Sequence, residues 1–457
     1  MAKKRRIKRR RPLLWIAILA CLAIALSALS PHLLQLLSKG QFRFNHRAKL
    51  QADETYQLEF WVERPNIPDI APWQAGLQQA IDEFRTVYPN VEVSLVHLSP
   101  QDVDQRMNDA LNQGTPPDLF FSANQPCGNL GELQLPLHRY IDKTERLAWP
   151  DSMWQQLQRS DGVYALPVAA YPRVFMANSQ LLADKGLEAD AFGEGEWNWP
   201  ALLALAEKLT AGQVVGYLPT STGQSLLTSL AASIGKPSPF DNDGELAWTK
   251  EDLVNLAEIW LRLMGSAGAP KGGGNMDSNC LDLFLSKRAA MIGPLNHQLT
   301  AWLWQAADKR GIVPQLMAIP AAGPEPYADV RVLGIALLRQ QDYQGDRHTR
   351  AAAELAQFLV PRLGGLLASL TGALPAVAPA SAATWLPYDE ESFAIYSQIE
   401  NIPRCSYAYG PPKGLSVTHW QLGIAPAWDR LVQGQYTAEQ FAEAVLAELA
   451  MATIAGP

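Results

Sequence analysis

Apolar residues after position 55 follow first the period of a strand and then that of a helix, and this pair repeats. YQLEFWV (56–62) is the first expected strand. Leu77, Ile81 and Phe84 then fall on one helical face, and Pro89-Asn90 ends that helix. Val91, Val93 and Leu95 mark the second strand. Val103, Met107, Ala110 and Leu111 mark the second helix, which Gly114 caps before the strand DLFFS. This β-α-β-α-β order predicts a parallel sheet with right-handed crossovers.

The helical period returns in the rest of the chain, with strand-like pieces between the helices. The predicted helices cover 199–211, 251–264, 349–360, 418–433 and 437–452, and the strand-like pieces include GVYALPV, AAMIG and VRVLGIALL. A chain of 457 residues exceeds what one hydrophobic core usually organises. We therefore expect an α/β protein with two lobes.

The N-terminus combines a basic segment with a long apolar run. Residues 1–11 hold eight Lys or Arg and no acid, and residues 12–37 contain no ionisable residue except His32. Such a run is long enough to cross a bilayer as a helix, and the positive-inside rule keeps the basic segment in the cytoplasm. We expect an uncleaved single-pass transmembrane anchor, then a polar linker over 38–55, with the body outside the cytoplasm.

Two other ways of processing this segment stay open. Ala25-Leu26-Ser27 has small residues at the right places for signal cleavage, and Cys21 in ILAC matches a lipidation site. A lipoprotein normally turns polar soon after its cysteine, whereas here apolar residues continue well past Cys21. The retained anchor is therefore favoured.

Charge argues against nucleic acid as a partner. The formal net charge is -7, and removing the eight basic residues of the N-terminal segment leaves about -15 for the remainder. Phosphate binding needs a positive surface on the folded part. The 48% of hydrophobic and 18% of charged residues are typical of a globular chain and exclude a disordered one.

Motifs for chemistry are absent from the sequence. It has no GxxxxGK[ST], HExxH or GxSxG, and its seven histidines form no pair at helical spacing. DNDGE (241–245) is interpreted as an Asx turn because it lacks the later ligands of a calcium loop. Cys127, Cys280 and Cys405 lack zinc-ligand spacing, and both one disulfide and three unpaired thiols stay open. We expect no metal and no cofactor.

A set of segments, taken in order and spacing, carries a family resemblance over about residues 56–452. They are FRTVYPNVEVSLV, MNDALNQGTPPDLFFS, LPLHRYID, DGVYALPVAAYPRVFMANSQLLADKGL, NWPALLALAEKLT, KRAAMIGPLNHQL, LVPRLGGLLASLTGALPA and AWDRLVQGQYTAEQFAEAVLAEL. The set resembles the extracellular solute-binding proteins of ABC importers, family 1, which are the relatives of maltose-binding protein.

The resemblance implies a two-lobed, periplasmic-binding-protein-like fold of type II that closes on a solute about a hinge. Each lobe is expected to be a mixed, mostly parallel sheet flanked by helices. The first lobe would take 56–168 and 331–360, and the second 169–330 and 361–457, with the hinge near LPVAA and VRVLG.

The function implied by this resemblance is capture of a carbohydrate between the lobes and its delivery to ABC permease subunits with their ATPase. It implies no catalysis. The expected partners are a small-molecule solute, for which the resemblance implies a sugar, the permease, and the cytoplasmic membrane through the N-terminal helix. A ligand-binding sensor stays open, as does a glycoside-acting enzyme, since paired carboxylates need no local motif.

Candidate site residues follow from the chemistry of a sugar, which offers an apolar C–H face to an aromatic ring and hydroxyls to buried polar groups. By resemblance, Trp420 lies where the relatives place a stacking Trp. Tyr171, seven residues before Asn178, lies where they place a polar cleft residue. The other candidates, chosen by residue type and position, are Asn124, Arg173, Trp61, Glu63, Gln224, Asn296 and Arg331.

Two segments depart from the pattern of these relatives. Ser122, Asn124 and Gln125 stand where the maltodextrin binder has a Trp and charged groups, and GPL (293–295) replaces GPW. Both changes favour a shorter or different glycoside over long maltodextrins.

Overall fold

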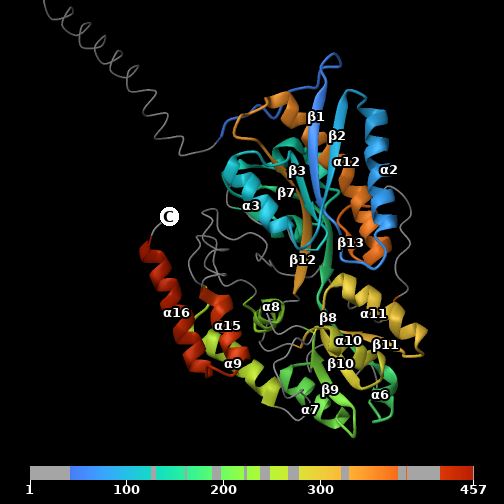
Figure 1. The fold of residues 1–457 in the computed structure, drawn as a ribbon, viewed down its shortest axis with the longest axis vertical. Helices are drawn as coiled ribbons and strands as arrows, with labels where there is room; N and C mark the ends of the chain where they lie inside the picture. The colour runs from blue at the N-terminus through green and yellow to red at the C-terminus, as the bar shows by residue number, and fades with distance from the viewer. Residues whose placement is uncertain are drawn as a thin grey trace, which may run out of the picture. The chain divides into compact units, whose positions relative to one another are not determined.

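The computed structural model describes residues 42–124, 130–159, 162–187, 197–220, 224–236, 247–265, 277–320, 329–378, 388 and 423–455 (Figure 1). The chain divides into two compact units, 1–45 and 46–457, and every described helix and strand belongs to the second. No helix in the described ranges has the length and apolar character to span a bilayer. The predictions for 12–37, Cys21, Cys127, Cys405, the DNDGE turn and Trp420 fall outside the described residues.

The larger sheet begins with the predicted β-α-β-α-β order, which is confirmed. Its elements are β1 (Tyr56–Glu63), α2 (Ala71–Val87), β2 (Val91–Leu98), α3 (Val103–Gln113) and β3 (Leu119–Ser122). β1 lies between β2 and β3 and pairs with both in parallel. Gly114 caps α3 at φ 72°, a left-handed conformation that glycine adopts without steric cost.

Antiparallel strands complete this sheet in the order β13-β7-β12-β3-β1-β2, with β4 beside β12. The added strands are β4 (Gln134–Leu135), β7 (Ala165–Pro172), β12 (Val330–Leu338) and β13 (Leu374–Pro375). β12 pairs antiparallel with β3, β4 and β7, and β13 pairs antiparallel with β7. The expectation of a mostly parallel sheet is therefore wrong, because parallel pairing is confined to the strands joined by crossover helices.

One long helix, α12 (Asp346–Thr371), packs on α2 and on the strands of this sheet, as Figure 1 shows. The predicted helix ends at residue 360, directly before Pro361, and a proline inside a helix removes a backbone N–H donor. The structure continues it for more than two further turns. Leu359, Leu363 and Leu367 are fully buried on both sides of the proline, so tertiary packing overrides the local break.

The smaller sheet is also mixed. Its order is β11-β8-β10-β9, formed by β8 (Val174–Asn178), β9 (Val215–Pro219), β10 (Ala289–Leu295) and β11 (Pro314–Met317). β10 is parallel to β9 and antiparallel to β8, which is antiparallel to β11. The helices of this part are α6 (Ser179–Ala183), α7 (Trp199–Leu209), α8 (Gln224–Ser233), α9 (Lys250–Gly265), α10 (Asp277–Leu285), α11 (His297–Lys309), α15 (Ala425–Val432) and α16 (Ala438–Ala455).

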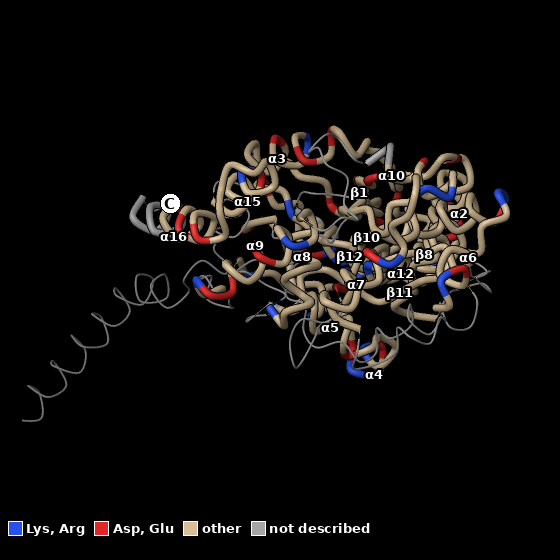
Figure 2. Tube along the Cα trace, turned by 90° about the horizontal axis from the view of Figure 1, so that it is seen from below, with Lys and Arg blue, Asp and Glu red and all other residues tan. Residues whose placement is uncertain are grey.

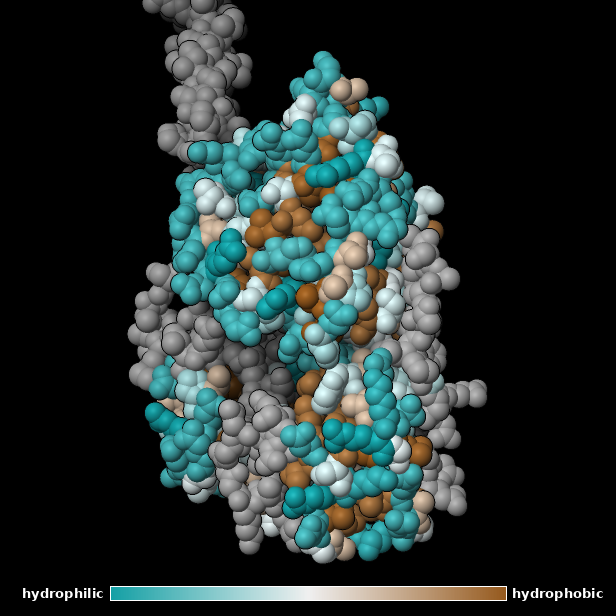
Figure 3. Space-filling model, turned by 45° about the vertical axis from the view of Figure 1, so that its right-hand side comes forward, coloured by the Kyte–Doolittle hydropathy of each residue, from teal (hydrophilic) through white to brown (hydrophobic). Residues whose placement is uncertain are grey.

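Short elements link β3 to β7. They are η1 (Gly131–Leu133), η2 (Leu137–Tyr140), α4 (Lys143–Arg146), α5 (Asp151–Gln156), β5 (Gln158–Arg159) and β6 (Gly162–Val163). Over the described helices acidic and basic residues are interspersed in the view of Figure 2. In Figure 3 hydrophilic residues cover much of the described surface, with apolar residues visible between them.

At one crossing the chain passes from the larger sheet to the smaller through a single residue. β7 belongs to the larger sheet and β8 to the smaller, and only Arg173 separates them. β12 runs beside β7, with Arg331 paired to Tyr171. These two strands are the segments in which the sequence places the hinge.

The C-terminal helices share a core with the smaller sheet. α16 packs on α9, and Trp428 of α15 lies between them, with its ring centroid 5.9 Å from Trp260 and 5.8 Å from Phe441. Trp260 is 1% exposed, so it lies on the buried face of α9. The last helices therefore complete this core.

Replacing Trp428 by Ala is expected to lower the free energy of unfolding by roughly 3–5 kcal/mol, because a large cavity opens between α9 and α16. Trp428→Phe keeps an aromatic ring there and should cost less. Guanidinium unfolding followed by circular dichroism measures both variants. A loss in Trp428→Ala below about 1 kcal/mol would contradict this packing.

Candidate functional site

Polar side chains meet at the carboxyl ends of β1 and β3, which are neighbours in the sheet. Glu63 ends β1 opposite Ser122 at the end of β3. Ser122 Oγ donates to Glu63 Oε2, and Asn124 Nδ2 donates to Glu63 Oε1 at 2.5 Å and to Arg64 O at 2.9 Å. Burial raises the pKa of Glu63, and the hydrogen bonds from Ser122 and Asn124 oppose that rise. Its two oxygens are thus held by the residues that follow in β3 and its loop.

Tyr171 brings strand β7 to the same point. Its hydroxyl donates to Asn124 O at 3.3 Å, and its ring centroid lies 4.1 Å from that of His297 at the start of α11. His297 is fully buried, and this burial lowers its pKa to about 3, so the imidazole is neutral near pH 7. The contact is therefore between two neutral rings.

Gln298 joins α11 to the end of β3. Its Nε2 atom donates to Ala123 O at 3.1 Å and to Asn124 Oδ1 at 2.7 Å, and the side chain is buried. α11 packs against β10 and β11 of the smaller sheet and also against α12, which lies on the larger sheet. Asn124 follows a strand of the larger sheet. Elements of both sheets therefore meet in one hydrogen-bonded network, which we call the Asn124 network: Glu63, Ser122, Asn124, Tyr171 and Gln298.

Asp329, directly before β12, forms a second buried polar group beside this network. Arg331 Nε lies 2.9 Å from its Oδ1, Arg173 Nε lies 3.7 Å from its Oδ2, and Ser229 Oγ donates to Oδ2 at 2.7 Å. Arg331 Nη2 also donates to Thr228 Oγ1 at 2.8 Å. Burial acts to raise the pKa of Asp329, but the two guanidinium groups outweigh it, and the pKa lies below its ordinary value. Strand β12, the link between β7 and β8, and helix α8 are thereby held around one carboxylate.

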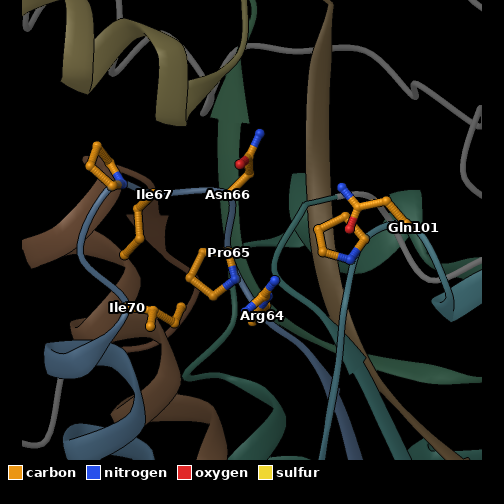
Figure 4. A pocket seen from close by; sticks show the side chains of 8 residues that line it. Arg64, Pro65, Asn66, Ile67, Ile70 and Gln101 are labelled. Carbon is orange, nitrogen blue, oxygen red and sulfur yellow. The ribbon is translucent and has the colours of Figure 1, made fainter.

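A hollow of about 210 Å³ lies where β1 and β2 end. It is lined by Arg64, Pro65, Asn66, Ile67, Pro68, Ile70, Pro100 and Gln101. Figure 4 shows Ile67 and Ile70 on one side of it and Gln101 on the other. The backbone N–H of Asn66 donates to Asn124 Oδ1 at 3.1 Å. The hollow thus adjoins the Asn124 network.

The structure brings together three of the residues predicted for the site: Glu63, Asn124 and Tyr171. Arg173 and Arg331 lie around Asp329 instead, next to Tyr171 in the strand pairing. Their role in binding a solute stays a prediction.

Other predicted residues lie elsewhere. Trp61 is 8% exposed, and the Arg106 guanidinium lies 5.1 Å from its ring centroid. Among the described residues its indole N–H makes no hydrogen bond to the Asn124 network. Asn296 is the N-cap of α11 and accepts from Leu299 N–H at 2.9 Å. Gln224 begins α8, but its side chain is not described, and Trp420 lies outside the described residues.

Sequence reasoning missed Gln298, His297 and Asp329. The first two stand directly after the N-cap Asn296 in GPLNHQL, a segment that carries the resemblance. Asp329 precedes the strand VRVLGIALL. No group of three or more metal-ligating side chains is found within the described parts of the chain.

The sequence matches the model of one known protein family. The family model for the bacterial extracellular solute-binding protein matches residues 68–359, which is more than half of the chain. The chain belongs to this family. The predicted resemblance is therefore confirmed.

Solved structures share the fold. The ABC substrate-binding protein of Listeria monocytogenes in complex with cycloalternan has a TM-score of 0.65 at 16% identity, over 88% of this chain and 100% of that one. The maltose/maltodextrin-binding domain of Bdellovibrio bacteriovorus bound to maltotriose has a TM-score of 0.62 at 16% identity, over 86% and 99%. These matches confirm the two-lobed α/β fold.

A curated relative matches a shorter stretch. An uncharacterised lipoprotein of Streptomyces antibioticus is 24% identical over 144 residues, which are 30% of this chain. The match covers 32% of that relative's length.

Replacing Asp329 by Asn is expected to lower the free energy of unfolding by roughly 3–5 kcal/mol, because it removes the negative charge between two buried guanidinium groups. Since the pKa of Asp329 is lowered in the folded state, its contribution is fully present above the ordinary carboxyl pKa and is lost as pH falls through the folded value. Urea unfolding at several pH values measures the difference between the two proteins, which should shrink in acid.

The matched control is Glu443→Gln, which breaks the exposed ion pair between Lys250 and Glu443. It should leave the free energy nearly unchanged. An equal decrease in the free energy of unfolding in Asp329→Asn and Glu443→Gln would show that burial of Asp329 does not increase its contribution to stability.

Proposed function

We propose that this solute-binding protein captures a carbohydrate at the Asn124 network and delivers it to the permease of an ABC importer. The observation that carries the proposal is the convergence of amide, carboxylate and phenol groups from both sheets at one point. Family membership supports binding without catalysis. The sugars in the structures that share the fold support the solute class.

The chemistry of the network suits a sugar hydroxyl. A hydroxyl both donates and accepts, so it pairs with a carboxylate such as Glu63 and with an amide such as Asn124. Both side chains lie next to the hollow formed by residues 64–70 and 100–101. We propose that Trp420 covers the apolar face of the sugar, as its family position suggests.

We propose that the lobes follow the two sheets. The first then takes β1 to β7 with β12, α12 and β13, and the second takes β8 to β11 with the C-terminal helices. β7 and β12 would form the hinge, because β7 continues through Arg173 into the smaller sheet. A solute that contacts both lobes favours their closure by its difference in affinity for the two states.

We also propose that residues 12–37 anchor the body on the outer side of the cytoplasmic membrane. Their apolar length and the basic segment before them support it. The protein should fractionate with membranes and keep its N-terminus. Recovery of a soluble form that starts at Ala28, or of a lipid on Cys21, would contradict the retained anchor.

A thermal-shift screen of the full chain tests the solute class. Maltotriose, mannotriose and several monosaccharides form the panel, with amino acids and dipeptides as the comparison set. We expect at least one sugar to raise the melting temperature, since a ligand that binds the folded state stabilises it. Stabilisation by amino acids or peptides alone would contradict a carbohydrate solute.

Replacing Trp420 by Ala should weaken binding of the stabilising sugar by roughly 1–3 kcal/mol and leave the melting temperature of the free protein unchanged. Calorimetric titration and thermal melts measure the two effects, with Trp428→Ala as the matched core control. Unchanged affinity together with a strongly lowered melting temperature would make Trp420 a core residue.

A further inference from the structure

We propose that Gln298 is a positioning residue that latches the two lobes together before any solute binds, an inference that rests on the proposed function. Its amide joins α11 to Ala123 and Asn124 by two hydrogen bonds. None of the sequence reasoning assigned it a role. The bridge consists of side-chain and backbone atoms of this chain alone.

The latch is a built contact, in which each partner is held by others. The N-cap Asn296 fixes the first turn of α11 by accepting from Leu299 N–H at 2.9 Å. On the other side, Asn124 is held by its bond to Glu63 Oε1 at 2.5 Å. The Tyr171 ring against His297 adds an apolar contact one residue before Gln298. Gln298 is 5% exposed, so little water competes for its amide.

Asn124 also connects the latch to the hollow at the ends of β1 and β2. Its Oδ1 accepts from Gln298 at 2.7 Å and from the Asn66 backbone N–H at 3.1 Å, and Asn66 lines the hollow. A solute that moves the 64–66 backbone therefore changes the geometry of the acceptor that Gln298 uses. Occupancy of the hollow and closure of the lobes are coupled through one oxygen atom.

The consequence is a population of closed molecules in the absence of solute. A contact present only when the lobes touch raises that population, and its loss lowers it by the free energy of the contact. The solute then needs to supply less of the free energy that closes the lobes. Loss of the latch should weaken solute binding, because fewer molecules are then closed before the solute arrives.

Hydrogen exchange of the full chain without solute tests the latch. Gln298→Leu replaces the amide side chain by an apolar one of similar size, which cannot form the two hydrogen bonds. Exchange in peptides over 119–124 and in the first turn of α11 should accelerate roughly three- to tenfold, which corresponds to the loss of a typical hydrogen bond. Asn124→Ala breaks the same bond from the other lobe and should accelerate exchange in α11.

Thr300→Val is the matched control, because Thr300 Oγ1 donates to Asn296 O at 2.7 Å within the same helix turn. It should accelerate exchange at the start of α11 and leave 119–124 unchanged. The latch is refuted if 119–124 is unaffected in Gln298→Leu, or if Thr300→Val affects it equally.

Saturating maltotriose forms the last arm of the experiment. If it binds, the difference between Gln298→Leu and the unmodified chain should shrink, because the solute itself joins the lobes. A difference that persists in full would contradict the latch. If maltotriose fails to bind, the solute-free comparison still decides the latch, and the thermal-shift screen decides the solute class separately.

Discussion

The buried carboxylate of Asp329 is the constraint on which the rest of the structure depends. A charge removed from water is tolerated only when opposite charge and hydrogen bonds replace its hydration. Arg331, Arg173 and Ser229 supply these from strand β12, from the link between β7 and β8, and from helix α8. The Asp329 carboxylate thus fixes the position of the link between β7 and β8, because losing its partners would leave a buried charge unpaired.

The Asn124 network follows from that fixed point. Pairing of Arg331 with Tyr171 sets the position of β7, and the Tyr171 hydroxyl then reaches Asn124 O. Parallel pairing of β1 and β3 brings Glu63 and Asn124 to the same edge, since the carboxyl ends of parallel strands meet there. α11 completes the network through Gln298. The site is therefore a product of strand register, and its polar groups satisfy one another where a solute would meet them.

The sequence was a good guide wherever the signal was local. Apolar periodicity predicts β1 to β3 with their two helices. Residue type, position and resemblance indicate Glu63, Asn124 and Tyr171, which the structure brings into contact.

It failed where tertiary contacts decide. The run of α12 past Pro361 depends on a buried leucine face. The antiparallel pairs within both mixed sheets depend on the direction in which the connecting strands enter them. Gln298 meets Asn124 across 174 residues, a pairing that no periodicity signals.

Hydrogen exchange of the unmodified chain with and without its stabilising sugar tests the central claim most directly. That claim is that a solute binds where elements of both sheets meet. Exchange should slow at residues 64–66 and 122–124, where β1 and β3 of the larger sheet end, and also at 297–299 of α11. Protection of only one of these sides, or of neither, would contradict the account.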